Sequence, residues 1–261
     1  MSHDDAAQRR VALITGAASG IGAATARRFA QQGWDVAINH LDAGQREAAG
    51  ALVAGANAPG QRAIAIEGDV TRDADCVRLV TTTVERLGRL DVLVNAAGIS
   101  VMVPHAKLHD VQADDFQRIY AVNAIGPFQM MRAAAPHLKA SGRGAVVNIS
   151  SRAALMGSGS SIPYAASKAA LNALTLALAR VLAPEVRVNA VCPALVEQGF
   201  VERLAPETFA QRRAHQIDVS PLQRIGHPDE VAEAIWWLGT GATMMTGAIV
   251  ELDFGMHLNA I

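Results

Sequence analysis

The sequence predicts one doubly wound α/β domain, with a seven-stranded parallel sheet and helices on both faces. Three observations support this fold class. Short apolar segments alternate with longer segments of helical periodicity along all 261 residues. The apolar segments lack an alternation of apolar and polar residues, as expected of parallel strands that helices cover on both faces. Hydrophobic residues make up 51% of the chain, which is enough for a large core.

The first half of the chain divides into four expected strands with a helix after each of the first three. The strands are short apolar runs, and the helices place apolar residues on one face or are rich in alanine. In chain order we expect a strand at residues 11–15, a helix at 20–32, a strand at 36–39, a helix at 43–54, a strand at 63–67, a helix through Val77, Val80, Val84 and Leu87, and a strand at 90–95.

The second half continues this order, with one kink and one long loop. Pro127 should kink the helix that contains it, because proline cannot donate a backbone hydrogen bond. Residues 193–228 look irregular, which suits a compact domain only if they form a functional lid, placed here at residues 194–223. The expected elements are a mostly helical segment at residues 113–138, a strand at 145–150, a helix at 163–182, a strand at 186–191, a helix at 231–238 and a strand at 248–252.

Charge and hydropathy argue against several classes of protein. Lysine plus arginine number 23 and aspartate plus glutamate 24, so a nucleic-acid partner or an anionic membrane surface is not expected. No apolar run approaches the roughly 18 to 20 residues that a membrane helix needs. Residues 1–10 are polar, without an apolar signal-peptide core, and are expected to form a disordered tail before a domain at residues 11–261. These features predict a soluble, cytoplasmic protein.

No metal site is expected either. Cys76 and Cys192 lie far apart, without metal-ligand spacing around them. Four histidines lie in expected loops or on expected solvated faces rather than paired on a helix as zinc favours, and we expect them at the surface: His105, His109, His137 and His215.

A glycine-rich segment, TGAASGIG at residues 15–22, follows the first expected strand directly. Such a turn lets the backbone approach a pyrophosphate closely, and the next helix offers free N–H groups and the positive end of its dipole. Its spacing differs from the general G-x-G-x-x-G fingerprint. A tight turn that needs glycine only for its dihedral angles is the alternative interpretation.

Six motifs in this order resemble the short-chain dehydrogenase/reductase family over nearly the whole chain. They are TGAASGIG, NAAG at residues 95–98, Asn123, the set Ser151, Tyr164 and Lys168, RIGHPDEV at residues 224–231, and a segment from Thr246-Gly247 to Asp253-Phe254-Gly255. The resemblance implies a Rossmann-like fold, an NAD(P)-dependent oxidoreductase acting on CH–OH groups, and a homotetramer built partly on the helices from Ala113 and Pro163.

The resemblance also implies which residues contact the cofactor. Gly16, Ser19, Gly20, Ile21 and Gly22 would hold the pyrophosphate. Asp69 and Val70 would contact the adenine, although Asp69 could instead cap a helix. Asn95 would lie near the adenosine ribose, Val196 would meet the nicotinamide amide through its backbone, and Tyr164 and Lys168 would complete the site.

The choice between NAD and NADP depends on the end of the second strand. Relatives that prefer NAD usually carry an aspartate where this chain has His40, followed by Leu41. A 2′-phosphate needs cations, and neither His40 nor Ser19 is a basic anchor, while Asp42 brings negative charge. Arg46 could reach back from the helix. The sequence favours NAD over NADP.

Tyr164 and Lys168 lie four residues apart, so they share one face of a helix. Carbonyl reduction needs a proton for the developing alkoxide, and alcohol oxidation needs that proton removed. Lowering a phenol pKa by about two to three units takes roughly 3–4 kcal/mol. An ammonium about 4 Å away supplies on the order of 4 kcal/mol at an effective dielectric near 20, although burial opposes it. The pair therefore predicts a general acid/base at Tyr164.

Two further polar residues would complete the catalytic set. Ser151 ends the fifth strand, at the edge where ligands bind in open α/β sheets, and its hydroxyl could stabilise charge on the substrate oxygen. Ser150 is its competitor, and a strand-end cap is the alternative role. Asn123 would bind a water that relays protons to Lys168, or would be satisfied inside the helix kink.

The expected substrate is a small carbonyl or alcohol compound. Met102, Leu155 and Met156 could line an apolar pocket, and the lid adds Phe200, Leu204, Phe209 and Ile217, with Arg203, Arg212 and Arg213 expected to face water. Two departures from the family, Ala194 after Pro193 and Gln198 in place of a threonine, put the cofactor contact of this loop in doubt.

Three alternatives remain open. A 3-oxoacyl-thioester reductase is disfavoured because Gly142 and Pro184–Glu185 stand where carrier-recognising members have basic residues. A non-catalytic, cofactor-sensing protein is disfavoured because the tyrosine and the lysine are both present. Epimerases or dehydratases of nucleotide sugars look longer and carry a different glycine turn.

Overall fold

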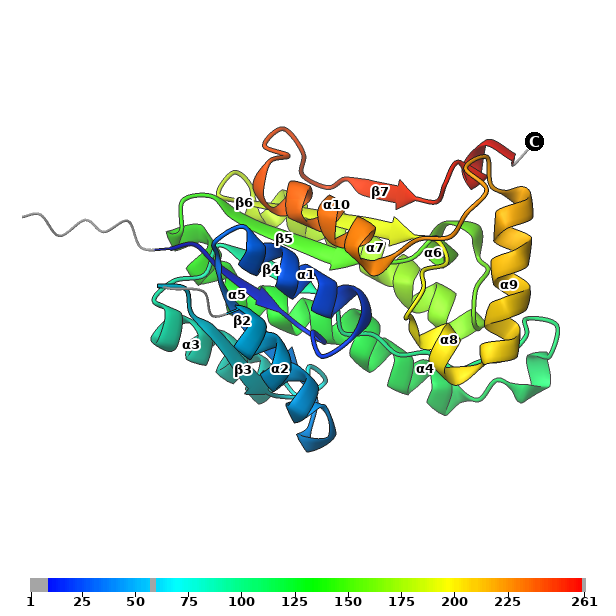
Figure 1. The fold of residues 1–261 in the computed structure, drawn as a ribbon, viewed down its shortest axis with the longest axis horizontal. Helices are drawn as coiled ribbons and strands as arrows, with labels where there is room; N and C mark the ends of the chain where they lie inside the picture. The colour runs from blue at the N-terminus through cyan, green and yellow to red at the C-terminus, as the bar shows by residue number, and fades with distance from the viewer. Residues whose placement is uncertain (1–8, 57–59, 260–261) are drawn as a thin grey trace, which may run out of the picture.

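The computed structural model describes residues 9–56 and 60–259, and the first eight residues of the predicted tail lie outside this range. Seven strands form one sheet in the order β3-β2-β1-β4-β5-β6-β7, and every neighbouring pair is parallel. Helices cover both faces (Figure 1). The predicted fold class is therefore confirmed. The strands are β1 (Val11–Ile14), β2 (Asp35–His40), β3 (Ala63–Glu67), β4 (Val92–Asn95), β5 (Gly144–Ile149), β6 (Val186–Pro193) and β7 (Ile249–Leu252).

The two faces of the sheet carry separate hydrophobic cores. Along β1, Ala12 and Ile14 pack into one core, whereas Val11 and Leu13 pack into the other, because successive side chains in a strand point to opposite faces. The first core includes Phe29 from α1 (Gly20–Gln31), and residues from α2 (Arg46–Ala56) and α10 (Pro228–Thr240). The second core includes residues from α3 (Asp73–Leu87), α5 (Gly126–Ala140) and α7 (Ile162–Leu182).

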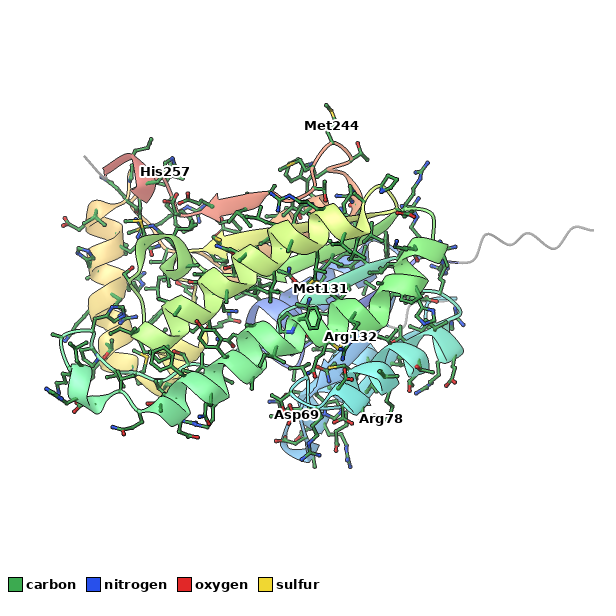
Figure 2. The ribbon with its side chains drawn as sticks, turned by 180° about the vertical axis from the view of Figure 1, so that it is seen from behind. Asp69, Arg78, Met131, Arg132, Met244 and His257 are labelled. Atoms are coloured by element: carbon green, nitrogen blue, oxygen red, sulfur yellow. The ribbon has the colours of Figure 1, made fainter. Side chains whose placement is uncertain are left out.

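The helices of the second core lie side by side behind the sheet, where Met131 of α5 is fully buried (Figure 2). Within the described residues, α7 alone is long and apolar enough to cross a membrane by length and composition. In the fold it packs against β6 and buries Leu171, Thr175 and Ala179. Its apolar character is therefore explained by its place in the core.

The long helix expected at residues 113–138 is divided. Helix α4 (Ala113–Tyr120) passes into a π-helical turn (Ala121–Ile125), which leads directly into α5. Pro127 lies in the first turn of α5 and has no N–H to donate to the carbonyl of residue 123. The predicted disturbance is thus present as a π turn just before the proline. Such turns occur frequently at functional sites.

The expectation of an irregular stretch at residues 193–228 is wrong in part. Two helices occupy it, α8 (Phe200–Leu204) and α9 (Pro206–Val219). Helix α9 begins with a proline in its first turn, a position that proline tolerates well, and buries only Phe209 and Gln216. Because so little of α9 is buried, its sequence has no apolar stripe to reveal it. A short helix, α6 (Ala153–Met156), was also not predicted.

Candidate active site

A cavity of about 660 Å³ lies at the carboxyl ends of the strands, the edge at which open α/β sheets bind ligands. It brings the glycine-rich turn together with Ser151, Tyr164 and Lys168, although they come from opposite halves of the chain. The predicted site residues in its wall are Gly16, Ser19, Gly20, Ile21, Gly22, Asp69, Val70, Ser151, Tyr164, Lys168 and Val196.

The glycine-rich turn is closed so tightly that side chains would not fit. Gly16 has φ +58°, and a Cβ there would lie 2.6 Å from the Cα of Ala97. A Cβ on Gly22 would lie 2.5 Å from the carbonyl oxygen of Gly16. Among the described residues, no side chain caps the start of α1, and its first turn contains no acidic residue. Its N–H groups therefore suit an anion such as a pyrophosphate.

Near the glycine turn, Asn39 of β2 and Leu41, which follows β2, lie in the cavity wall, but His40 does not. The His40 ring is 3% exposed, and its Nδ1 lies 2.9 Å from the carbonyl oxygen of Asp42. The prediction that His40 occupies a cofactor-contacting position is therefore not supported by this geometry. The Asn39 side chain accepts from the N–H of Gly16 and donates to backbone carbonyls of β3 and the following turn, which ties the glycine turn to the sheet.

Asp69 lies where the predicted adenine contact requires it, but it is not the N-cap of α3. It lies in the cavity wall, and its Oδ1 also accepts from the backbone N–H of Thr71 at 2.9 Å, just before α3. The helix cap itself is Arg72. One carboxylate oxygen of Asp69 is thus engaged in the turn.

Asn95 lies behind the cavity wall. Its Nδ2 donates to Oδ1 of Asn148 at 2.8 Å, which joins β4 to β5. Its Oδ1 is buried and has no hydrogen-bond partner among the residues that the structure describes. A buried acceptor without a partner is costly, so this amide keeps one unsatisfied group close to the predicted ribose position.

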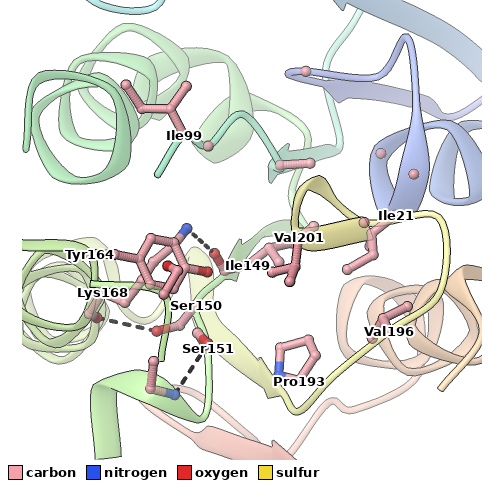
Figure 3. Close-up of a pocket in the computed structure, with 18 of the residues that line it drawn as sticks. Ile21, Ile99, Ile149, Ser150, Ser151, Tyr164, Lys168, Pro193, Val196 and Val201 are labelled. Atoms are coloured by element: carbon pink, nitrogen blue, oxygen red, sulfur yellow. Dashed lines mark hydrogen bonds between the residues drawn. The ribbon is translucent and has the colours of Figure 1, made fainter. Parts of the chain in front are cut away.

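Tyr164 and Lys168 project from the first turns of α7 toward the end of β5 (Figure 3). The helix starts there because Ser161 accepts a hydrogen bond from the N–H of Tyr164 at 3.3 Å. Nζ of Lys168 donates to the carbonyl oxygen of Ile149 at 2.8 Å and lies 5.9 Å from the centre of the Tyr164 ring. The strand end therefore holds the ammonium beside the phenol.

The two serines after β5 are distinguished by their partners. The Ser150 hydroxyl donates to the carbonyl oxygen of Lys168 at 3.2 Å and is committed to α7. The Ser151 oxygen accepts from the N–H of Ala153 at 3.2 Å, which leaves its hydroxyl hydrogen directed away from the backbone. Ser151 also hydrogen-bonds the Tyr164 side chain, which lowers the pKa of that phenol. The geometry therefore favours Ser151 as the substrate-facing serine.

Burial is the largest influence on the pKa values of Tyr164 and Lys168. Burial raises the pKa of Tyr164 to about 12, although the Ser151 hydrogen bond opposes it. Burial also lowers the pKa of Lys168 to about 8. The protein by itself thus does not give the lowered phenol pKa that the spacing of the two residues predicts. At neutral pH the phenol is protonated and the lysine is mostly charged.

Asn123 is fully buried in the π turn and does not reach the cavity wall. Its Oδ1 accepts from the N–H of Ile99 at 2.9 Å, and its Nδ2 donates to the carbonyl oxygen of Ile99 and to Oγ of Ser167, both at 3.0 Å. The side chain is therefore committed to bracing the loop after β4, which is the second of its two predicted roles.

The substrate end of the cavity differs from the predicted one. The wall does not include Met102, Leu155 or Met156, and the last two are more than 40% exposed because they lie on the outer side of α6. Apolar wall residues come instead from the lid and the C-terminal segment: Leu195, Val201 and Met256.

The prediction missed several polar wall residues, including Arg152. Its position next to Ser151 was the signal that could have found it. Arg212 was expected to face water but also lies in the wall, because α9 is a helix that turns this residue inward. His215, one helical turn later, is exposed as predicted, yet it borders the same cavity.

Comparison with known proteins agrees with this geometry. The family model described as Enoyl-(Acyl carrier protein) reductase matches residues 16–257. The chain is 42% identical over 257 residues to ketoacyl reductase 2 assigned to the granaticin polyketide synthase of Streptomyces violaceoruber, covering 97% of this chain and 98% of that protein. It is 37% identical over 253 residues to cis-4-hydroxycyclohexanecarboxylate dehydrogenase of Sinomonas cyclohexanicum, covering 96% and 98%.

A solved structure is similar throughout. The crystal structure of a short-chain dehydrogenase/reductase from Burkholderia xenovorans superposes with a TM-score of 0.89 at 42% identity, covering 97% of this chain and 99% of that one. Structural similarity and sequence similarity therefore indicate the same protein family.

Proposed function

The chain belongs to the short-chain dehydrogenase/reductase family, and on this premise we propose that it is an NAD(P)-dependent oxidoreductase that interconverts a ketone and a secondary alcohol. One observation carries the proposal. A single cavity joins the closed glycine turn at the start of α1 to the Ser151–Tyr164–Lys168 set at the end of β5. A hydride carrier and an acid/base group would therefore meet over one substrate.

The residues around the glycine turn fit a dinucleotide. Gly16, Gly20 and Gly22 leave room for a pyrophosphate at the uncapped helix start, and Asp69 and Val70 lie where an adenine would be held. Val196 also borders the cavity, on the side of Ile21 (Figure 3). When bound, the nicotinamide supplies or accepts the hydride.

The chain's own residues manage the proton. In reduction, Tyr164 is protonated at neutral pH, because burial raises its pKa to about 12, and its hydroxyl can give a proton to the substrate oxygen. The Ser151 hydroxyl, which hydrogen-bonds the Tyr164 side chain in this structure, can donate to the same substrate oxygen as negative charge develops there. In oxidation, the Lys168 ammonium stabilises the phenolate through its positive charge.

We propose NAD as the preferred carrier. The wall near β2 consists of Asn39, Leu41 and Gln45, with no cation among the described wall residues there. The nearby Arg46 pairs with Glu67 at 2.9 Å. A 2′-phosphate would thus lack a free cation, which disfavours NADP.

A screen tests this function directly. The purified protein is mixed with NAD or NADP and a panel of secondary alcohols, and with the reduced carriers and the matching ketones, while nicotinamide absorbance is followed. We expect turnover with a higher kcat/KM for NAD. Absence of turnover with every compound, together with absence of carrier binding in calorimetry, would refute the proposal.

A 3-oxoacyl thioester is the second candidate substrate, because one relative is named a ketoacyl reductase. Acetoacetyl-coenzyme A therefore belongs in the panel.

We also propose a homotetramer, because α4, the π turn after it and α7 expose apolar side chains in the single chain: Phe116, Ile125, Leu176 and Val181.

A further inference from the structure

Charge is distributed unevenly around the cavity. Among the described residues, Asp69 is the one acidic side chain in the wall, and it lies near the ends of β2 and β3. Three arginines also lie in the wall, Arg152, Arg203 and Arg212, and two of them, Arg152 and Arg212, lie near the catalytic set. An anionic ligand group would therefore be attracted to the end that contains Tyr164.

Arg203 belongs to the glycine turn rather than to the substrate end. Its Nη1 donates to the carbonyl oxygen of Gln198 at 2.9 Å. That oxygen lies 3.4 Å from the place where a Cβ on Gly20 would be. Arg203 is thus held above the turn that would bind the pyrophosphate.

Arg212 is tied to the loop that packs against the Tyr164 ring. Its Nη2 donates to the carbonyl oxygen of Gly159 at 2.9 Å, and a Cβ on Gly159 would lie 3.7 Å from Cδ1 of Tyr164. The guanidinium is partly buried, which lowers its pKa, and no carboxylate in the described part of the chain pairs with it. A guanidinium has five N–H donors, so most of those of Arg212 remain for a ligand.

Arg152 is the second arginine of the wall that lies near the catalytic set. It follows Ser151 directly, and its backbone N–H donates to the carbonyl oxygen of Pro193 at 3.0 Å. Its Nε lies 3.5 Å from Oδ2 of Asp253, a carboxylate that is 3% exposed and also accepts from His257. Asp253 therefore positions Arg152 and offsets part of its charge, which leaves Arg212 as the less compensated cation.

We propose that the substrate carries a carboxylate, and that Arg212 binds it with Arg152 as a second donor. This inference rests on the proposed function and narrows it to oxo acids and the corresponding hydroxy acids. The planar fork of an arginine matches a carboxylate, and such charged pairs gain strength away from water. Leu195, Val201 and Met256 in the wall suit the hydrocarbon skeleton between the carboxylate and the reacting carbon.

Paired substrates test this inference. The kcat/KM of the wild-type protein is measured for 4-oxopentanoate and 4-oxocyclohexanecarboxylate and for their methyl esters, which differ only in charge and one methyl group. We expect a preference for the acids of at least about tenfold, expressed mainly in KM. Equal use of acid and ester by the wild-type protein would overturn the inference while leaving the proposed function intact.

Variants at Arg212 and Arg213 test which residue causes the preference for acids over esters. We expect Arg212→Gln to bring the acid-to-ester ratio to about one and Arg212→Lys to retain an intermediate ratio, because lysine keeps the charge but not the fork. Arg213→Gln is the matched control, since Arg213 is exposed and absent from the wall. An unchanged ratio in a folded Arg212→Gln protein would contradict the assignment.

A binding measurement separates this inference from catalysis. Calorimetric titrations with cyclohexanecarboxylate and cyclohexanecarboxamide, in the presence of saturating dinucleotide, need no turnover. We expect the carboxylate to bind at least about tenfold more tightly, and this difference to disappear in Arg212→Gln. Equal binding of both probes to the wild-type protein would overturn the inference. Use of acetoacetyl-coenzyme A but of no oxo acid would also overturn it.

Discussion

Tyr164 is buried, and its proposed role is to exchange a proton with the substrate. Its hydroxyl is the group that can exchange a proton with the substrate oxygen, while carrier binding depends on the glycine turn. We predict that Tyr164→Phe lowers kcat by about 10²–10⁴-fold, the usual contribution of general acid–base catalysis, without weakening carrier binding. Steady-state kinetics and calorimetry measure the two effects. Retention of more than a few per cent of the activity would contradict the assignment.

Lys168 should make stability depend on pH in a defined direction. Its pKa is about 8 in the folded protein and near its ordinary value of 10.5 when unfolded. Between these values the unfolded chain binds more protons, so the folded state gains stability as pH rises. The lowering corresponds to roughly 3 kcal/mol.

The variant Lys168→Met removes this titration, and Tyr164 remains in both proteins. We therefore expect the stability of the wild-type protein relative to Lys168→Met to rise by up to about 3 kcal/mol between about pH 7 and about pH 10. Urea unfolding at fixed protein concentration measures it. A constant or falling difference would show that Lys168 is not buried in this way.

At the scale of the element, the turn between β1 and α1 requires glycine for steric reasons. Gly16 has a positive φ, and a side chain would collide with the backbone of Ala97. We predict that Gly16→Ala lowers Tm and weakens dinucleotide binding by at least about tenfold, because the turn must open to accept a Cβ.

Gly50 provides the control. It lies within α2, where an added Cβ would meet no atom of the described residues within 4 Å. Gly50→Ala should raise stability by up to about 1 kcal/mol, because alanine favours the helix, and should leave binding unchanged. Equal behaviour of the two variants in thermal melts and calorimetry would contradict the steric argument.

Elements differ in how clearly their sequences indicate them. The strands were predicted to within two residues at each end, since burial on both faces makes them continuously apolar. Helix α9 was missed because it buries only Phe209 and Gln216. A helix that packs with so few side chains leaves no periodic signal in the sequence.

At the scale of the whole molecule, apolar side chains remain exposed on several elements. Val181 of α7 is 67% exposed, and Met244 projects from the loop between α10 and β7 with 98% exposure (Figure 2). We predict that sedimentation equilibrium will give four times the chain mass of 27.4 kDa. Val181→Glu should yield smaller species, since a buried unpaired charge disfavours association. A monomeric wild-type protein would refute the tetramer.

The sequence alone determined the features that depend on neighbours along the chain. The order of strands and helices, the glycine turn and the shared face of Tyr164 and Lys168 all follow from local spacing. These features were sufficient to place the chain in its family and to indicate its chemistry.

Only the tertiary structure decided which side chains reach the cavity and how they are charged there. It turned His40 and Asn123 away from the wall, brought Arg152 and Arg212 to it, and raised the phenol pKa that the spacing predicted to be lowered. The physical reason is that orientation and desolvation depend on packing between segments far apart in the sequence, such as α9 against the loop before α7.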